Sequence, residues 1–399
     1  MVKYKISKVY FLFIAFVIVV TSSCKKDSTP VPLPPIVEPP PPPSGGTSLA
    51  AVDNDINAFM TKYNVPGMSV AITRYGKLVY AKGYGMADKE AGESVTTKSL
   101  FRLASLSKWF TSTAIMKLIQ EGKLGFNDKV FGTGGVLGTE YGTPPYGPYI
   151  TDITIEQLLH HTGGGWGNSS NDPMFANREM NVYSLLNWVV NSRPLERAPG
   201  TQWDYSNIGF SILARVIEKK SGQPYDAYVK ENILTPCGIT AMQIGSSTLS
   251  GRKTNEVKYY GLGSANAYGY GDGVIERLDG AGGWIASPTD LMRLLVRVDN
   301  FPDVEDILTP ATLQIMSSKT TASGNYACGF IVSGTGNWYH GGTLTGTRNW
   351  MVRTTTGYNW AILINTSATN DAFNTDLDKL IWPAVNSVST PWPDVDLFK

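Results

Sequence analysis

Residues 101–122 have the sequence FRLASLSKWFTSTAIMKLIQEG, and we expect residues 101–120 of this stretch to form a long helix. Residues 101–120 are largely apolar, and the glycine at position 122 is typical of a helix stop. Ser105 and Lys108 are three residues apart, so a helix places both side chains on one face. The positive N-terminal end of a helix also favours developing negative charge. The stretch therefore predicts a helix that presents a serine hydroxyl beside an amine.

The pair of Ser105 and Lys108 has the composition of an activated nucleophile. A serine hydroxyl is a weak nucleophile until a base removes its proton, and a partly desolvated lysine can act as that base. Ser-x-x-Lys occurs four times in the chain, beginning at Ser22, Ser23, Ser105 and Ser250. Only the copy at Ser105 opens a long apolar helix. A helix-opening serine with a solvated lysine is the alternative interpretation, so further motifs are needed.

Tyr205-Ser206-Asn207 is the single Tyr-x-Asn sequence, and it lies between Pro199-Gly200 and a helical pattern. A phenol has an ordinary pKa near 10, so it can relay protons if a cation such as Lys108 stabilises its anion. The Asn207 amide can donate to and accept from a substrate peptide bond. A turn tyrosine followed by a helix-capping asparagine is the alternative.

His340-Gly341-Gly342 is the second of two His-x-Gly sequences, and Thr343 and a strand pattern follow it. The first copy, at His161, is expected in a structural turn. The glycines, Gly342 among them, would let a substrate approach the backbone closely. The backbone N–H groups of Ser105 and Thr343 could then form an oxyanion hole. His340 could donate to a substrate carboxylate or to the Tyr205 hydroxyl, or could simply lie at a strand edge.

The rest of the globular sequence has strand patterns near both ends and helical patterns between them. Strands are expected at residues 68–73, 78–84, 327–333, 349–353 and 360–365. Further helices are expected at residues 53–63, 155–160, 183–191, 208–220 and 372–385. We therefore expect an α+β fold, an α/β sandwich in which an antiparallel sheet from both chain ends is flanked by helices, with a mostly helical inserted subdomain. A cleft between the two parts is the expected place for a site.

The N-terminal segment predicts export. Residues 1–24 combine a lysine-rich start, an apolar run at residues 9–20 that is too short to span a bilayer, and small residues before Cys24. This is similar to a bacterial lipoprotein signal, in which Cys24 would be lipidated. An ordinary cleaved signal is the alternative. Both imply export, and the first places the protein in the bacterial cell envelope, in the periplasm or at the outer membrane, with a lipid anchor in the membrane.

Residues 25–48 are rich in proline, glycine and serine, which favours an extended linker over a packed core. The globular domain is then expected over residues 49–390. The membrane face that the domain occupies and its oligomeric state are not readable from the sequence.

Composition argues against several classes of partner. The net charge of +1 gives no reason to expect nucleic acid or an acidic surface as a partner. The three histidines form no His-x-x-x-His pattern and there is no Cys-x-x-Cys pair, so no metal and no other cofactor is expected. Cys237 and Cys328 remain beyond Cys24, and the sequence leaves open whether they are paired.

The three motifs, in this order, resemble the serine β-lactamase and penicillin-binding protein superfamily, and more narrowly its class C β-lactamase-related group. That group includes D,D-carboxypeptidases, D-aminopeptidases and serine esterases. The resemblance extends over about residues 56–366. It includes the sequence at residues 101–108, 121–124, 153–163, 199–200, 205–209 and 282–290.

The resemblance implies that Ser105 is acylated, that Lys108 and Tyr205 share the proton transfer, and that Asn207 positions the substrate. His340 stands where class C β-lactamases carry the lysine of Lys-Thr-Gly, and a neutral imidazole attracts a carboxylate less strongly. Arg348 could supply the missing positive charge, or could be an exposed strand residue.

Two functions remain open at this point. One is an exported serine hydrolase acting on a small ester, an amide, a D-residue peptide or a β-lactam, with peptidoglycan-derived peptides among the candidate substrates. The other is a non-catalytic protein on the same fold that is tethered at the envelope and binds peptidoglycan or a partner. The serine, lysine and tyrosine are all retained, which favours the enzyme.

Overall fold

The computed structural model describes residues 47–399. The predicted signal, Cys24 and nearly all of the predicted linker therefore lie outside the described residues. The strands are β1 (Gly67–Arg74), β2 (Lys77–Asp88), β3 (Glu93–Ser94), β4 (Phe101–Arg102), β5 (Gln243–Ile244), β6 (Trp284–Ala286), β7 (Ile331–Val332), β8 (Trp338–Leu344), β9 (Thr347–Arg353) and β10 (Tyr358–Ile364).

Most of the helices lie between β4 and β7, and the others lie near the two ends of the described residues. They are α1 (Ala50–Tyr63), α2 (Ser107–Gln120), α3 (Ile155–Leu159), α4 (Val182–Ser192), α5 (Asn207–Ser221), α6 (Tyr225–Val229), α7 (Val274–Arg277), α8 (Asp279–Gly282), α9 (Pro288–Leu295), α10 (Pro310–Met316), α11 (Asp371–Lys379) and α12 (Trp382–Asn386). A 3₁₀ turn, η1 (Ala104–Leu106), precedes α2, and short 3₁₀ or π turns lie elsewhere.

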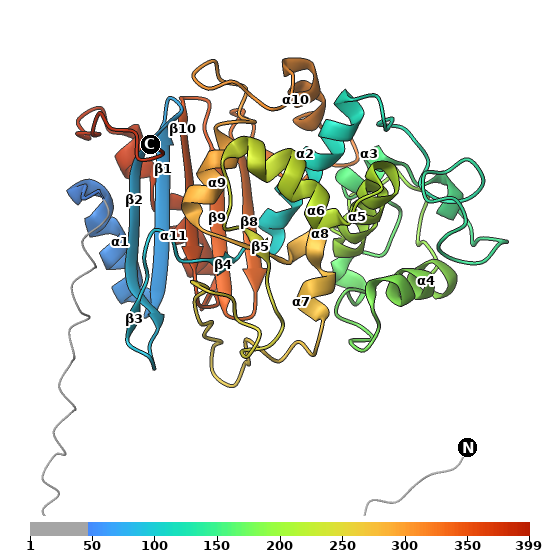
Figure 1. Cartoon of the computed structure of the whole chain (residues 1–399), viewed down its shortest axis with the longest axis horizontal. Helices are drawn as coiled ribbons and strands as arrows, with labels where there is room; N and C mark the ends of the chain where they lie inside the picture. The colour runs from blue at the N-terminus through green and yellow to red at the C-terminus, as the bar shows by residue number, and fades with distance from the viewer. Residues whose placement is uncertain (1–46) are drawn as a thin grey trace, which may run out of the picture. The chain divides into compact units, whose positions relative to one another are not determined.

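The main sheet joins the two ends of the described chain. Its order is β3-β2-β1-β10-β9-β8-β7, and each adjacent pair is antiparallel. Strand β1 pairs with β10 so that Met68 lies opposite Ile364. Figure 1 shows the blue strands β1 and β2 beside the orange and red strands β8–β10, with the middle helices to one side. The predicted antiparallel sheet from both chain ends, with a mostly helical insertion, is confirmed.

The sheet is buried on both faces because alternate side chains enter two different cores. In β10, Trp360, Ile362 and Ile364 pack into one core, which also includes residues of α1, α11 and α12. Ala361 and Leu363 of the same strand face the second and larger core, which contains the middle helices. The strand is therefore apolar from Trp360 to Ile364, and its period-2 pattern is hidden in the sequence.

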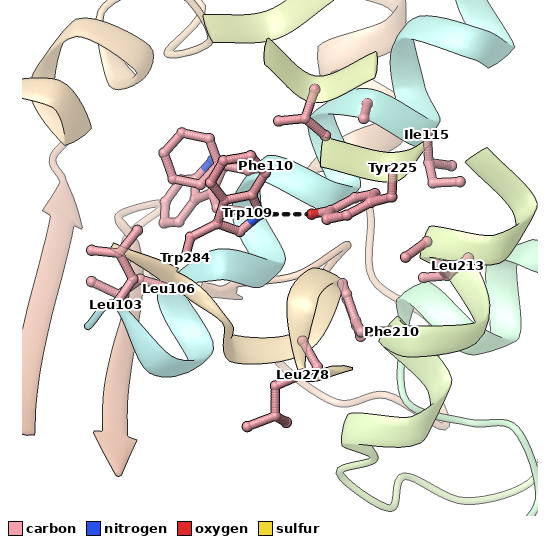
Figure 2. Close-up of a cluster of buried hydrophobic side chains, with 14 of the residues drawn as sticks. Leu103, Leu106, Trp109, Phe110, Ile115, Phe210, Leu213, Tyr225, Leu278 and Trp284 are labelled. Atoms are coloured by element: carbon pink, nitrogen blue, oxygen red, sulfur yellow. Dashed lines mark hydrogen bonds between the residues drawn. The ribbon is translucent and has the colours of Figure 1, made fainter. Parts of the chain in front are cut away.

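The larger core encloses α2, the helix that follows Ser105. Trp109, Phe110 and Trp284 are fully buried there. Figure 2 shows these side chains with Tyr225, whose hydroxyl accepts a hydrogen bond of 3.0 Å from Nε1 of Trp284. The packing of these large aromatic side chains holds α2 firmly in place. Its N-terminal residues are consequently fixed relative to the sheet.

Three predicted boundaries were wrong. The helix predicted from residue 101 begins at Ser107, because residues 101–102 form strand β4 in a small sheet with β6. The helix predicted at residues 372–385 is two helices, α11 and α12, and Pro383 lies in the first turn of the second, where a missing N–H costs least. The strand predicted at 327–333 is reduced to β7, because Gly329 turns the chain with a φ of +86°.

Other features of residues 47–399 bear on the sequence expectations. Cys237 and Cys328 are both free and buried, so they do not form a disulfide. None of the helices in this part of the chain combines the length and apolar character that crossing a bilayer requires. Contacts with the domain continue to the C-terminus, where the Leu397 N–H donates to the Leu78 carbonyl at 2.9 Å.

Candidate active site

Ser105 lies on the 3₁₀ turn η1, between β4 and α2. The chain enters this turn through Ala104, which has a φ of +50°, a conformation that non-glycine residues rarely adopt. Strand β9 holds the two residues before Ala104 in place. The side-chain amide of Asn349 on β9 donates to the carbonyls of Arg102 at 2.8 Å and Leu103 at 3.2 Å. The Ser105 side chain is half-buried. Tertiary hydrogen bonds thus hold the predicted nucleophile at a strained turn.

Lys108 is completely buried one turn further along the chain. Its Nζ donates to Oδ1 of Asn207 and to the Ala281 carbonyl, both at 2.7 Å, and lies 3.3 Å from Oγ of Ser105. Burial lowers the pKa of Lys108 from 10.5 to about 7, and the negative charge of Asp172 opposes this shift. The amine is therefore available in its neutral form near pH 7. A neutral amine beside a hydroxyl can accept its proton.

Tyr205 lies on the other side of Lys108, whose Nζ is 4.8 Å from the centre of the tyrosine ring. The Tyr205 hydroxyl is buried and makes no hydrogen bond of good geometry with any residue in the described part of the chain. Burial raises the pKa of Tyr205 above its ordinary value of 10, and the nearby Ser105 hydroxyl opposes that shift only in part. Tyr205 is thus a neutral phenol in this state. Of the two groups, Lys108 is the one whose pKa allows it to accept a proton near pH 7.

Asn207 is the first residue of α5, whose N-terminus is capped by Ser206. Its side chain is held at both ends, because Oδ1 accepts from Lys108 and Nδ2 donates to Oδ2 of Asp172 at 2.7 Å. Its backbone N–H donates to Oδ1 of Asn168 at 3.0 Å. A chain of hydrogen bonds therefore runs from Lys108 through Asn207 to Asp172.

Asp172 and Asn168 are site residues that sequence reasoning missed. They lie in the polar loop NSSNDP at residues 168–173, which reads as an ordinary turn because Asp-Pro sequences favour turn initiation. No spacing in the sequence connects this loop to Tyr205 or Asn207. The polar composition of this loop, upstream of the Tyr-x-Asn sequence, was a weak signal.

A cavity of about 270 Å³ joins these residues. It is lined by Ala104, Ser105, Asn168, Asp172, Phe175, Tyr205, Asn207, Leu278, Ala281, Gly282, Thr343 and Leu344. The volume is slightly below the range of about 300–1,000 Å³ that is usual for drug-sized ligands. The structure thus brings the predicted residues Ser105, Tyr205, Asn207 and Thr343 to one small cavity.

His340 is placed differently from the other predicted residues. It is buried on β8, and its Nδ1 donates to the Gly341 carbonyl at 2.6 Å. Its Nε2 therefore accepts from the Tyr326 hydroxyl at 3.1 Å. Burial lowers the pKa of His340 to about 3, with the positive charges of Lys108 and Arg348 acting in the same direction. The imidazole is neutral, and both nitrogens already have partners in this structure.

Arg348 lies opposite Thr343 in the register of β8 and β9. Its Nη1 donates to Oγ1 of Thr343 at 2.9 Å and its Nε donates to Oδ1 of Asn374 at 2.7 Å. The guanidinium is half-buried and does not line the cavity itself. Arg348 therefore borders the site through Thr343.

His161, in the first His-x-Gly sequence, packs against Tyr205. Its φ of +58° places it in the expected turn. Its Nδ1 accepts from the Ser206 N–H at 3.1 Å, and its ring lies 4.2 Å from that of Tyr205. Its Nε2 has no hydrogen-bond partner among residues 47–399, so only one of the two nitrogens is satisfied. The contact of the two rings helps to hold the Tyr205 side chain in place.

Gly342 marks the closest approach of β8 to the serine turn. A Cβ added here would lie 2.2 Å from the Leu103 carbonyl oxygen, a backbone atom that cannot rotate away. Gly342→Ala is expected to destabilise the protein by about 1–3 kcal/mol and to lower the rate of ester hydrolysis, because η1 must shift. Chemical unfolding and ester hydrolysis measure the two effects.

The matched control is Gly334→Ala, where an added methyl group would meet no atom within 4 Å. Unchanged stability and rate in Gly342→Ala would contradict this description of the contact.

The same fold occurs in solved proteins of low sequence identity. The structure of D-amino acid amidase from Ochrobactrum anthropi SV3, complexed with L-phenylalanine amide, superposes with a TM-score of 0.68. The superposition covers 85% of the present chain and 100% of the amidase chain, at 20% sequence identity. At this identity the likeness shows the fold alone. The shared architecture is the antiparallel sheet with flanking helices described above.

The family follows from the sequence itself. The family model described as Beta-lactamase matches residues 52–381, which is most of the chain. The chain belongs to the β-lactamase family, and the expected resemblance is confirmed. Members of this fold family are generally serine hydrolases.

Curated relatives match about half of the chain. Protein flp of Staphylococcus aureus (strain N315) is 31% identical over 191 residues, which cover 47% of this chain and 37% of the relative. Penicillin-binding protein 4* of Bacillus subtilis (strain 168) is 32% identical over 194 residues, which cover 46% of this chain and 39% of the relative. The chain thus spans well under half the length of these relatives.

Proposed function

We propose that this protein is an exported serine hydrolase that acts through an acyl-serine intermediate on a small ester, amide or D-residue peptide. The observation that carries the proposal is the buried Lys108 amine, 3.3 Å from Oγ of Ser105, with its pKa lowered to about 7. A serine beside a base of matched pKa is the arrangement that nucleophilic catalysis requires. The D-amino acid amidase that shares the fold is consistent with an amide substrate.

The chemistry follows from the positions of the groups. Neutral Lys108 accepts the Ser105 proton while Oγ attacks the substrate carbonyl. The backbone N–H groups of Ser105 and Thr343 are the proposed donors to the oxygen that becomes negative. The proton then passes from Lys108 to the leaving group, with Tyr205 as the proposed relay. Water hydrolyses the acyl-serine by the reverse proton path, which releases the acid and restores Ser105.

Asn207 would orient the substrate, because it lines the same cavity and its side chain is held by Lys108 at Oδ1 and by Asp172 at Nδ2. His340 would support the site indirectly, through its hydrogen bond with the Tyr326 hydroxyl and its place on β8 next to Gly341 and Gly342. Its neutral state provides no charge for a substrate carboxylate, which argues against efficient β-lactam hydrolysis. Arg348 is the nearest proposed cation for such a group, through Thr343.

The proposed location is the bacterial cell envelope, with Cys24 as the lipidated residue and residues 25–48 as the linker to the domain. The sequence of residues 1–24 supports this proposal. A small-molecule or peptide substrate, with peptidoglycan-derived peptides among the candidates, suits that location.

The proposal is tested by covalent labelling. The domain from about residue 48 onward is incubated with an alkyl fluorophosphonate, and the intact mass is measured. We expect one adduct per chain, located on Ser105 by peptide mapping. Ser250→Ala is the matched control, because Ser250 begins another Ser-x-x-Lys sequence but lies exposed. It should label as the wild type does, whereas Ser105→Ala should not.

A wild-type protein that forms no adduct and turns over no ester would overturn the proposal. It would favour the non-catalytic envelope protein that binds peptidoglycan or a partner.

A further inference from the structure

The cavity beside Ser105 carries a single formally charged side chain, and that side chain is acidic. Among the described residues that line the cavity, Asp172 is the one carboxylate, and no lysine or arginine is present. Phe175, Leu278 and Leu344 contribute apolar surface. The cavity is therefore suited to a small acyl group with a positive charge rather than to a substrate carboxylate.

The cations around the cavity do not line it. Lys108 donates to Asn207 and to the Ala281 carbonyl, lies 3.3 Å from Oγ of Ser105, and must be neutral to act as the base. Arg348 is held by Thr343 and Asn374 outside the lining. Arg193 also stabilises the Asp172 carboxylate, but it lies outside the lining, and burial raises the pKa of Asp172. When Lys108 is neutral, no described residue of the lining itself pairs with the negative charge of Asp172. A bound cation would supply one.

Asp172 retains free hydrogen-bonding capacity. Its Oδ2 accepts from Nδ2 of Asn207 at 2.7 Å, and its Oδ1 accepts from the Met174 N–H at 2.9 Å. A carboxylate offers about four acceptor positions, so each oxygen can take a further donor. The side chain is partly exposed at the cavity. Phe175, three residues along the same turn, places an aromatic ring at the cavity, and aromatic faces also attract ammonium groups.

We propose that Asp172 is a specificity-determining residue that binds an ammonium group of the substrate, so that the preferred substrates are amides or esters of amino acids with a free α-amino group. This inference rests on the proposed function of the site. The cavity volume of about 270 Å³ suits one aminoacyl group better than an extended peptide. Neutralising Asp172 would also remove the charge that opposes the lowering of the Lys108 pKa.

A purely structural role for Asp172 makes a different prediction. If Asp172 only holds Asn207, any variant that keeps an acceptor for Nδ2 should preserve activity on all substrates equally. Asp172→Asn is such a variant, because its amide oxygen can accept from Asn207 while the negative charge is removed. The ratio of activity on charged and uncharged substrates thus separates the two roles.

The test compares alanine p-nitroanilide with its N-acetyl derivative, in both D and L forms, at pH 7. A free α-amino group, with a pKa near 8, is mostly protonated at this pH. We expect the wild type to prefer the free amine by at least about tenfold in kcat/KM, which is the effect of one charge-assisted hydrogen bond. Asp172→Asn should reduce this preference to about twofold or less. Comparing the two substrates within each variant cancels any change in turnover that both substrates share, such as a change that acts through the Lys108 pKa.

The control variant is Asp272→Asn, which removes the same charge from an exposed residue that does not line the cavity. It should keep the wild-type preference. A wild type without any preference for the free amine, or an Asp172→Asn variant that keeps the preference, would overturn the inference.

A binding measurement separates this inference from the proposed function. Calorimetry on Ser105→Ala compares alaninamide with N-acetylalaninamide, and the free amine should bind more tightly unless Asp172→Asn is added. Equal binding of the two amides would overturn the inference. Asp172-dependent binding without any Ser105-dependent turnover would overturn the hydrolase proposal and leave the ammonium site supported.

Discussion

Ser105→Ala is expected to lower kcat for a small activated ester by at least about 10,000-fold, because no acyl-serine can form. The side chain is half-buried, and its hydroxyl makes one long contact of 3.3 Å with Lys108. Removing it should change the free energy of unfolding by no more than about 1 kcal/mol. Steady-state ester hydrolysis and chemical unfolding measure the two quantities on the same samples.

Ser250→Ala serves as the control and should keep full activity. A Ser105→Ala variant that retained wild-type turnover while remaining folded would show that another residue is the nucleophile.

Lys108→Met is expected to lower kcat/KM by about 100- to 10,000-fold, the usual contribution of a general base. Methionine has nearly the length of lysine but cannot accept the Ser105 proton. The folded state loses the hydrogen bonds to Asn207 and Ala281, yet it no longer buries an amine whose pKa is lowered. Because these effects oppose each other, we expect the melting temperature to shift by about 5 °C or less.

The pH dependence follows from the same lysine. The base must be neutral, so kcat/KM should rise with pH up to about 7, the pKa of buried Lys108, and then level off. His340 has its pKa lowered to about 3 and stays neutral over this range, so the limb near pH 7 does not come from it. A wild-type profile without a limb near pH 7, or one that Lys108→Met leaves intact, would contradict the assignment.

The free energy of unfolding should also depend on pH through Lys108. Between about pH 7 and 10.5 the unfolded chain binds a proton at Lys108 that the folded chain does not. The free energy of unfolding therefore contains a contribution that increases with pH in this window and is absent in Lys108→Met. Unfolding the two proteins at pH 7 and pH 9 would measure the difference.

Local sequence was sufficient for the elements that short-range patterns control. The hairpin of β1 and β2 and the helices α1, α4 and α5 were predicted to within a few residues, because turn glycines and helical periodicity act locally. The α2 boundary failed because residues 101–102 are drawn into a strand with β6, far along the chain. The helix or strand propensity of residues 101–102 cannot indicate a pairing strand that lies so far along the chain.

The candidate site divides in the same way. Ser105 and Lys108 are linked by helical spacing, and Tyr205 and Asn207 by a short motif, so local sequence and the family resemblance were enough to select them. The pairing of His340 with Tyr326 and the position of Asp172 depend on loops that meet only in the folded chain. Nothing in the spacing of residues 168–173 indicates that they approach Asn207.

By itself, the sequence determined the residue types available for acyl transfer, their order and the sheet built from both chain ends. Only the tertiary structure decided their ionisation and charge environment. The pKa of Lys108 is lowered because packing removes water from its amine, and the cavity is acidic because a distant loop places Asp172 in its wall. Desolvation and charge proximity act through space, so they depend on the fold and are not encoded in any local pattern.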